Sequence, residues 1–399
     1  MTMKINNPKL LWQLTCEGSW PSAVTFVGSG QRIAAANQEG QIYLWDLPAE
    51  PGKFEAEKNS ELKAPNHDPI RRFDGHTNGV THLRATRDGK VLVSASLDHS
   101  LRLWDPTSPA NGQGEAILDG DQRRSKAKRD KKKEEEILKA PGVKVETVTA
   151  KQVLGGHTDW VMALGMSGDE TRLISGDARA GVIVWDLPAA KETARWTGLP
   201  WNWIRAAALS QDGKTAIVTE SCDKHDDFDI PAAALRTYDA TSGQIKHDVM
   251  KNHLPKYDIK ATSYGSAQVW RKFVSAGLIA ADISPDGKLA AVGQGGENDT
   301  GKFHIVDMES GKVLREISGH RYGVTDGRFS SDGKYLLSTG RDTTLRITNV
   351  EDGKEVAALG SPRGGQFKDW FSALAISPDE QTVAVADIAG LIQVWSLST

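Results

Sequence analysis

Short apolar runs alternate with polar turns along most of the chain, and no stretch keeps the three-to-four-residue spacing of an amphipathic helix. The clearest example is the segment 75–105, which reads GHTNGVTHLRATRDGKVLVSASLDHSLRLWD. A Gly-His pair opens this segment, a Trp-Asp pair closes it, and two runs of strand character lie between them, at 90–94 and 101–104. The pattern predicts an all-β core made of short strands.

This frame returns at a fixed interval, which is typical of repeat proteins. A spacing of 28 positions joins three pairs of residues: His76 and Trp104, His157 and Trp185, and His320 and Thr348. A second marker is a polar hairpin turn, often Asp-Gly, between apolar runs. It occurs at 28–30, 87–89, 168–170, 211–213, 285–287, 331–333 and 378–380. Seven turns predict seven repeats.

The repeats resemble those of the WD-repeat family of β-propellers. Gly-His pairs stand at 75–76, 156–157 and 319–320, Trp-Asp pairs at 45–46, 104–105 and 185–186, and weaker endings at 238–239, 306–307, 348–349 and 395–396. The resemblance implies one domain over residues 1–399, a single seven-bladed propeller of four-stranded antiparallel blades. It also implies that Lys9–Leu14 forms the outer strand of the last blade, beside Leu391–Leu397, and so closes the ring.

Three insertions interrupt the repeats, at about 106–149, 221–230 and 250–276. The middle of the first insertion, residues 121–136, has eight basic and five acidic residues and no aromatic ones. Such a segment buries too little apolar surface to offset its ordering entropy, so we expect a mobile loop or a solvated helix. A basic docking arm is the alternative. The resemblance implies that the other two insertions lie on the top face of blades four and five.

The resemblance also implies a buried structural tetrad of His, Ser or Thr, Asp and Trp inside a blade. Blade two matches fully, blade three has Arg179 in place of the Asp, and blade six has Thr348 in place of the Trp. The tetrad residues are His76, Ser94, Asp98 and Trp104; His157, Ser175 and Trp185; and His320, Ser338 and Asp342. Because the resemblance buries the Ser inside a strand, a structural role is favoured over hydrolysis. The remaining blades are expected to depend on apolar packing.

The position just before each innermost strand is either Trp or Gly, and four blades have Trp: Trp20, Trp160, Trp203 and Trp370. In WD-repeat proteins this loop faces the top surface, where aromatic side chains suit partner binding. Arg179 and Arg341 would add charged anchors there, and Tyr322 would extend the aromatic patch. The rings would equally suit a flat or cationic ligand, or each Trp would act as a lid on the neighbouring blade.

Composition narrows the function further. The formal net charge is −3, which gives no support for a nucleic-acid or membrane partner, and no apolar run is long enough to span a bilayer. Two cysteines do not suggest a disulfide framework, and the first residues lack the apolar core of a signal peptide. We therefore expect a cytoplasmic protein without metal or cofactor, present as a monomeric propeller within a larger complex.

The sequence thus predicts a non-catalytic scaffold that binds a protein or peptide on its top face. One alternative is an enzyme at the channel mouth that uses a metal or small ligand, because Cys222–Asp229 contains thiol, imidazole and carboxylate groups. The other alternative is nucleic-acid binding through the basic residues of 121–136 or 251–272.

Overall fold

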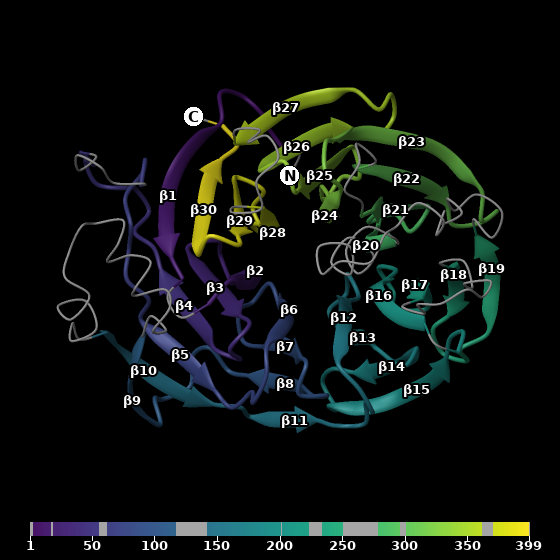
Figure 1. Cartoon of the computed structure of the whole chain (residues 1–399), viewed down its shortest axis with the longest axis horizontal. Coiled ribbons are helices and arrows are strands. Elements are labelled where there is room, and N and C mark those ends of the chain that lie inside the picture. Colours follow the sequence, from purple (N-terminus) through teal and green to yellow (C-terminus); the bar gives the residue numbers. More distant parts are fainter. Residues whose placement is uncertain are drawn as a thin grey trace, which may run out of the picture. The chain divides into compact units, whose positions relative to one another are not determined.

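The structure is a computed structural model that describes residues 3–16, 19–55, 62–116, 142–200, 202–222, 234–249, 278–295, 301–360 and 370–398. Every regular element in these residues is a β-strand, from β1 to β30 (Figure 1). The strands form seven sheets, each containing one four-stranded blade. The predicted all-β class and the seven four-stranded blades are therefore confirmed.

The described residues fall into two compact units. The terminal unit comprises residues 4–98, 102–153 and 373–399, and the central unit comprises mainly residues 154–372. In the terminal unit, blade one contains β2 (Pro21–Val27), β3 (Arg32–Asn37), β4 (Ile42–Asp46) and β5 (Arg71–Asp74). Blade two contains β6 (Val80–Ala85), β7 (Leu92–Ser96), β8 (Leu101–Trp104) and β11 (Gln152–Leu154). Blade seven contains β28 (Phe371–Ile376), β29 (Thr382–Asp387), β30 (Leu391–Ser396) and β1 (Lys9–Thr15).

The central unit holds blades three to six. Blade three contains β12 (Val161–Met166), β13 (Arg172–Asp177), β14 (Gly181–Asp186) and β15 (Lys191–Thr197). Blade four contains β16 (Asn202–Leu209), β17 (Thr215–Cys222), β18 (Ala234–Asp239) and β19 (Ile245–Val249). Blade five contains β20 (Leu278–Ile283), β21 (Leu289–Gln294), β22 (Gly301–Asp307) and β23 (Val313–His320). Blade six contains β24 (Val324–Phe329), β25 (Tyr335–Gly340), β26 (Thr344–Asn349) and β27 (Glu355–Gly360).

The hairpin between the first two strands is set by local hydrogen bonds. In blade two the Thr86 hydroxyl donates to the Asp88 carboxylate over 2.6 Å, and the same carboxylate accepts the backbone N–H of Lys90. Five further blades repeat the Ser/Thr-x-Asp pair at 2.6–2.7 Å, through Asp169, Asp212, Asp286, Asp332 and Asp379. Side-chain oxygens thereby satisfy the backbone donors of each tight turn.

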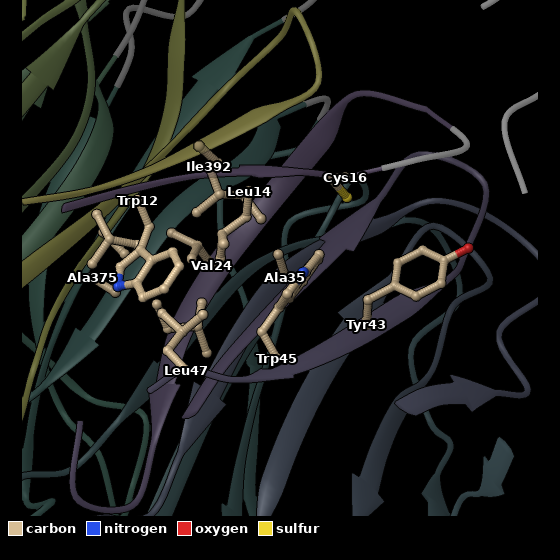
Figure 2. Packing of buried hydrophobic residues seen from close by; sticks show 14 of the residues in the cluster. Trp12, Leu14, Cys16, Val24, Ala35, Tyr43, Trp45, Leu47, Ala375 and Ile392 are labelled. Carbon is tan, nitrogen blue, oxygen red and sulfur yellow. The ribbon is translucent and has the colours of Figure 1, made fainter. Parts of the chain in front are cut away.

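The N-terminal strand completes the last blade. β1 pairs antiparallel with β30, from Lys9 opposite Ser396 to Thr15 opposite Leu391. Its buried side chains Trp12 and Leu14 pack with Trp45 and other apolar residues of blades seven and one (Figure 2). The prediction that the N-terminal strand forms the outer strand of blade seven is therefore confirmed.

The two ends of the first insertion are ordered strands, which the sequence did not predict. β9 (Gly112–Ala116) and β10 (Val143–Thr149) form an antiparallel hairpin, and β10 pairs parallel with β5. The hairpin extends blade one outward to six strands, and Val145 and Ala116 are buried in the apolar cluster that contains Trp45. Val145 and Val148 stabilise this hairpin because they bury apolar surface, whereas the expectation of a mobile loop or solvated helix concerns the middle of the insertion, residues 121–136. The charged centre, residues 117–141, lies outside the described residues.

Among the described residues, there is no helix with the length and apolar character needed to cross a membrane.

Candidate protein-interaction surface

Each blade of the central unit brings two loops together at one end. The start of the first strand pairs with the end of the second, as Val161 opposite Asp177 and Val324 opposite Gly340 show. The loop before the first strand therefore lies beside the loop that joins strands two and three. We call this end of the blades the top face. A backbone hydrogen bond joins the two loops in blade three, from the Ala178 N–H to the Trp160 carbonyl at 2.9 Å.

In blade two the four predicted tetrad residues form one hydrogen-bonded chain. His76 Nδ1 lies 2.8 Å from Asp98 Oδ2, and His76 Nε2 lies 2.6 Å from Ser94 Oγ. The Trp104 indole N–H donates to the same Ser94 oxygen over 2.9 Å. Burial lowers the pKa of His76, although the hydrogen bond to Asp98 acts in the opposite direction. Because Ser94 is fully buried, its hydroxyl cannot meet a substrate and serves to hold the strands together.

Blade six builds a related chain without a Trp. His320 lies 3.0 Å from Asp342 Oδ1 and 2.9 Å from the Ser338 hydroxyl. Thr344 donates to the same Asp342 oxygen over 2.7 Å. Burial alone would raise the pKa of Asp342, but hydrogen bonds from His320 and Thr344 and the charge of His320 lower it to about 2. The Asp342 carboxylate therefore stays ionised and joins the top-face loops of this blade.

Blade three does have a carboxylate, two positions before the one expected from the repeat. Asp177 Oδ2 lies 2.9 Å from His157 Nδ1, and His157 Nε2 lies 2.7 Å from Ser175, which accepts the Trp185 indole N–H at 2.8 Å. The other Asp177 oxygen accepts the backbone N–H groups of Arg179 and Gly181. Arg179 itself points outward, with 72% of its side chain exposed, and pairs with Asp159 at 3.1 Å.

Polar groups also lie near the end of the second strand in blades expected to depend on apolar packing. Glu220 of blade four is fully buried and accepts hydrogen bonds from Arg236, Tyr238 and the backbone N–H of Leu199. Burial, and then the charge of Glu220, raises the pKa of Tyr238 to about 12. The equivalent residues in blades one, five and seven are Asn37, Gln294 and Asp387. The signal that was available in the sequence is this recurring polar residue after four apolar positions.

The four predicted tryptophans differ in exposure. Trp160 is 43% exposed and Trp20 is 50% exposed, whereas Trp203 and Trp370 are half-buried. Trp160, Trp203 and Trp370 belong to the central unit, and Trp20 belongs to the terminal unit. The central unit therefore carries three of these rings: Trp160 and Trp370 lie directly before β12 and β28, and Trp203 is the second residue of β16.

Arginine side chains lie over three of the top-face rings of the central unit. The guanidinium carbon of Arg205 lies 5.7 Å from the centre of the Trp203 ring, that of Arg321 lies 5.5 Å from Tyr322, and that of Arg341 lies 4.8 Å from Trp370. These are cation–π distances. Arg205 and Arg321 were not among the predicted residues, although each lies within two positions of a predicted aromatic residue.

Arg341 differs from the expected accessible anchor. It is only 6% exposed, it contacts the Trp370 ring, and its backbone N–H donates to the Gly323 carbonyl at 3.1 Å. Gly323 stands at the Trp/Gly position of blade six with φ of +95°, a conformation that favours glycine. Arg341 is therefore a buried partner of Trp370, while Arg179 and Arg321 are the exposed arginines of these loops.

Two predicted insertions lie wholly or mostly outside the described residues: all of 250–276, and residues 223–230 of the insertion 221–230. Ser221 and Cys222, at the start of the second predicted insertion, belong to β17. Within the ranges that are described, no three His, Cys, Asp or Glu side chains gather closely enough to hold a metal ion.

Comparison with known proteins agrees with this geometry. The family WD domain, G-beta repeat matches residues 67–105, 149–186 and 311–349. Each match begins at the outer strand of one blade (β5, β11 or β23) and ends with the third strand of the next (β8, β14 or β26). The repeat is therefore offset from the blade, as the resemblance implied.

Curated relatives share the repeat at low identity. Autophagy-related protein 16 of Arabidopsis thaliana is 25% identical over 57% of this chain and 45% of its own length. The U3 small nucleolar RNA-associated protein 15 homolog of Gallus gallus is 21% identical over 82% of this chain and 48% of its own. WD repeat-containing protein 18 of Homo sapiens is 37% identical over 22% of this chain and 19% of its own. The chain thus spans at most about half the length of these relatives.

Three matched repeats, seven four-stranded blades and the shared offset between repeat and blade together confirm the resemblance of the chain to WD-repeat proteins of the seven-bladed β-propeller class.

Proposed function

We propose that this protein is a non-catalytic scaffold that binds a protein or peptide partner through its top face. The supporting observation is the group of rings on the central unit, Trp160, Trp203, Tyr322 and Trp370, beside the guanidinium groups of Arg179, Arg205 and Arg321. Large aromatic and arginine side chains carry most of the binding energy in protein interfaces. Relatives named for autophagy and for association with a small nucleolar RNA support an interaction role in general.

Burial separates the polar networks from this role. The His–Ser–Asp chains of blades two, three and six have buried serines, so they organise loops rather than face a ligand. Trp160, in contrast, follows Asp159 directly, and the Asp159–Arg179 pair holds the loop beside it. We further propose that the protein works in the cytoplasm as one propeller within a larger complex, which size-exclusion chromatography of native extract would test.

The experiment uses three forms of the full chain as bait in native extract: the wild type, a test variant and a control variant. Quantitative mass spectrometry identifies the proteins that each form captures. The test variant is Trp160→Ala/Trp203→Ala, and the matched control is Ile245→Ala/Leu314→Ala, which truncates apolar side chains that are 55% and 56% exposed on outer strands. Circular dichroism and thermal melting establish that all three are folded.

We expect each tryptophan truncation to cost about 2 kcal/mol of binding free energy. Partners held by the top face should therefore be depleted from the Trp160→Ala/Trp203→Ala bait and retained by the control. Equal capture by all three baits would contradict a top-face site. Loss of folding in the test variant alone would show that the rings serve as lids on the blades.

A further inference from the structure

We infer that the partner segment recognised by the top face of the central unit is an acidic peptide, in which Asp or Glu residues flank an apolar side chain. This inference rests on the proposed function, since it names the chemistry of the partner at the same surface. Three observations support it: exposed arginine side chains, buried carboxylates and the contacts between arginine and aromatic side chains.

Among the described residues of this surface, the accessible charge is mainly cationic. Arg321 is exposed, the Arg179 side chain is 72% exposed, and Arg205 is half-buried. These guanidinium groups come from blades three, four and six, so positive charge is spread along the central unit rather than confined to one loop.

Most carboxylates of the same described loops and strand ends are buried, and each contacts a histidine or an arginine of the protein. Asp177 and Asp342 are 2% and 1% exposed and contact His157 and His320, while Glu220 is fully buried against Arg236. Asp159, which is partly exposed, pairs with Arg179. Of the described side chains, guanidinium groups are therefore more accessible to a ligand than carboxylates, and an anionic ligand gains Coulomb energy from them where a cationic one loses it.

The rings complete the argument because arginine already covers one face of three of them. A cationic ligand that would otherwise stack on Trp203, Tyr322 or Trp370 finds a guanidinium group beside the ring. Holding a guanidinium against a ring also limits its rotamers, so less side-chain entropy is lost when it binds a carboxylate. The exposed ring of Trp160 suits an apolar side chain, which gives the mixed acidic and apolar character of the inferred peptide.

Single-stranded nucleic acid shares the anionic chemistry but fits less well. The formal net charge of −3 gives no long-range attraction for a polyanion. A peptide is therefore the inferred occupant, and an oligonucleotide enters the test as a competing probe.

The test measures binding of positional-scanning dodecapeptide pools to the full chain, with one position fixed as Glu, Gln, Lys or Leu in each pool. The first variant is Arg205→Gln/Arg321→Gln. A second variant, Arg179→Gln/Arg321→Gln, replaces two exposed arginines and serves if half-buried Arg205 is needed for folding. The matched control is Lys288→Gln/Lys354→Gln, which removes the same charge from turns at the opposite end of blades five and six, where these side chains are 78% and 81% exposed. Trp160→Ala/Trp203→Ala tests the surface itself.

We expect Glu-fixed and Leu-fixed pools to be enriched over Gln-fixed pools, and Lys-fixed pools to be depleted. The arginine variants should weaken binding of Glu-fixed pools at least about tenfold, with the lysine control unchanged. Pools that depend on Trp160 and Trp203 but prefer Gln or Lys would overturn the acidic inference and leave the proposed function standing. If the peptide pools bind the Trp160→Ala/Trp203→Ala variant as tightly as the wild type, both the acidic inference and the proposed function are contradicted. Tighter binding of single-stranded oligothymidylate that displaces the Glu-fixed pools would assign the surface to nucleic acid instead.

Discussion

At the scale of single residues, one position decides how the polar groups of each blade are satisfied. This position lies in the second strand, opposite the residue that follows the Trp/Gly position, and it holds Asp177 in blade three and Glu220 in blade four. Both residues are buried, and both accept backbone N–H groups from the top-face loops. Buried carboxylates are tolerated only when donors surround them, so these residues hold the top-face segments that carry Trp160 and Trp203 in place.

Replacing Asp177 tests this role directly. Asp177→Ala should lower the free energy of unfolding by ~3 kcal/mol or more, because it leaves His157 and two backbone N–H groups without their acceptor. Arg179→Ala, which stands at the position where the repeat predicts the Asp, should cost less than about 1 kcal/mol as an exposed ion pair. Urea denaturation of both variants gives the comparison. A larger loss for Arg179→Ala would assign the structural role to the arginine.

At the scale of elements, strands far apart in the sequence complete one another's sheets. β1 is the outer strand of blade seven, and β10 extends blade one in a parallel pairing with β5. Both additions bury side chains against one apolar cluster, to which β1 contributes Leu14 and β10 contributes Val145. The added strands also cover edges that would otherwise present unpaired backbone groups.

Truncating Leu14 tests the contribution of the N-terminal strand. Leu14 is fully buried, so Leu14→Ala should lower the free energy of unfolding by about 2–5 kcal/mol. Lys9→Ala, on the same strand with an exposed side chain, should be nearly neutral. Thermal and urea unfolding measure both variants. If the two changes have the same small effect, β1 does not hold blade seven together.

At the scale of the whole chain, buried histidines connect stability to pH. Burial lowers the pKa of His76 in blade two and of His304 in blade five, so each stays neutral in the folded protein. The unfolded chain takes up protons at these residues below its ordinary histidine pKa of about 6.5. Since the unfolded state then binds more protons than the folded state, stability falls as the pH is lowered.

Acidification should therefore destabilise the protein before its carboxylates titrate. We expect the urea midpoint to be lower at about pH 5.5 than at about pH 7.5. His304→Gln should reduce this difference, because it removes one of the two groups whose pKa is lowered. A midpoint that stays constant or rises on acidification would show that the histidines do not resist protonation in the folded state.

Sequence alone predicted the short strands and the seven repeats. These features follow from local rules: apolar alternation, polar hairpin turns and a fixed interval between Gly-His and Trp-Asp. The four-stranded blades, the offset of repeat from blade and the pairing of β1 with β30 were predictable through the resemblance to WD-repeat proteins that these local patterns carry.

Only the tertiary structure decided which side chains meet. It selected Asp177 over Arg179 as the partner of His157, buried Arg341 against Trp370, and ordered the ends of the charged insertion against blade one. These outcomes depend on contacts between distant residues, such as Arg71 and Glu146, which are 75 positions apart. No local pattern encodes such pairings, because burial and neighbouring charge arise only when the sheets pack together.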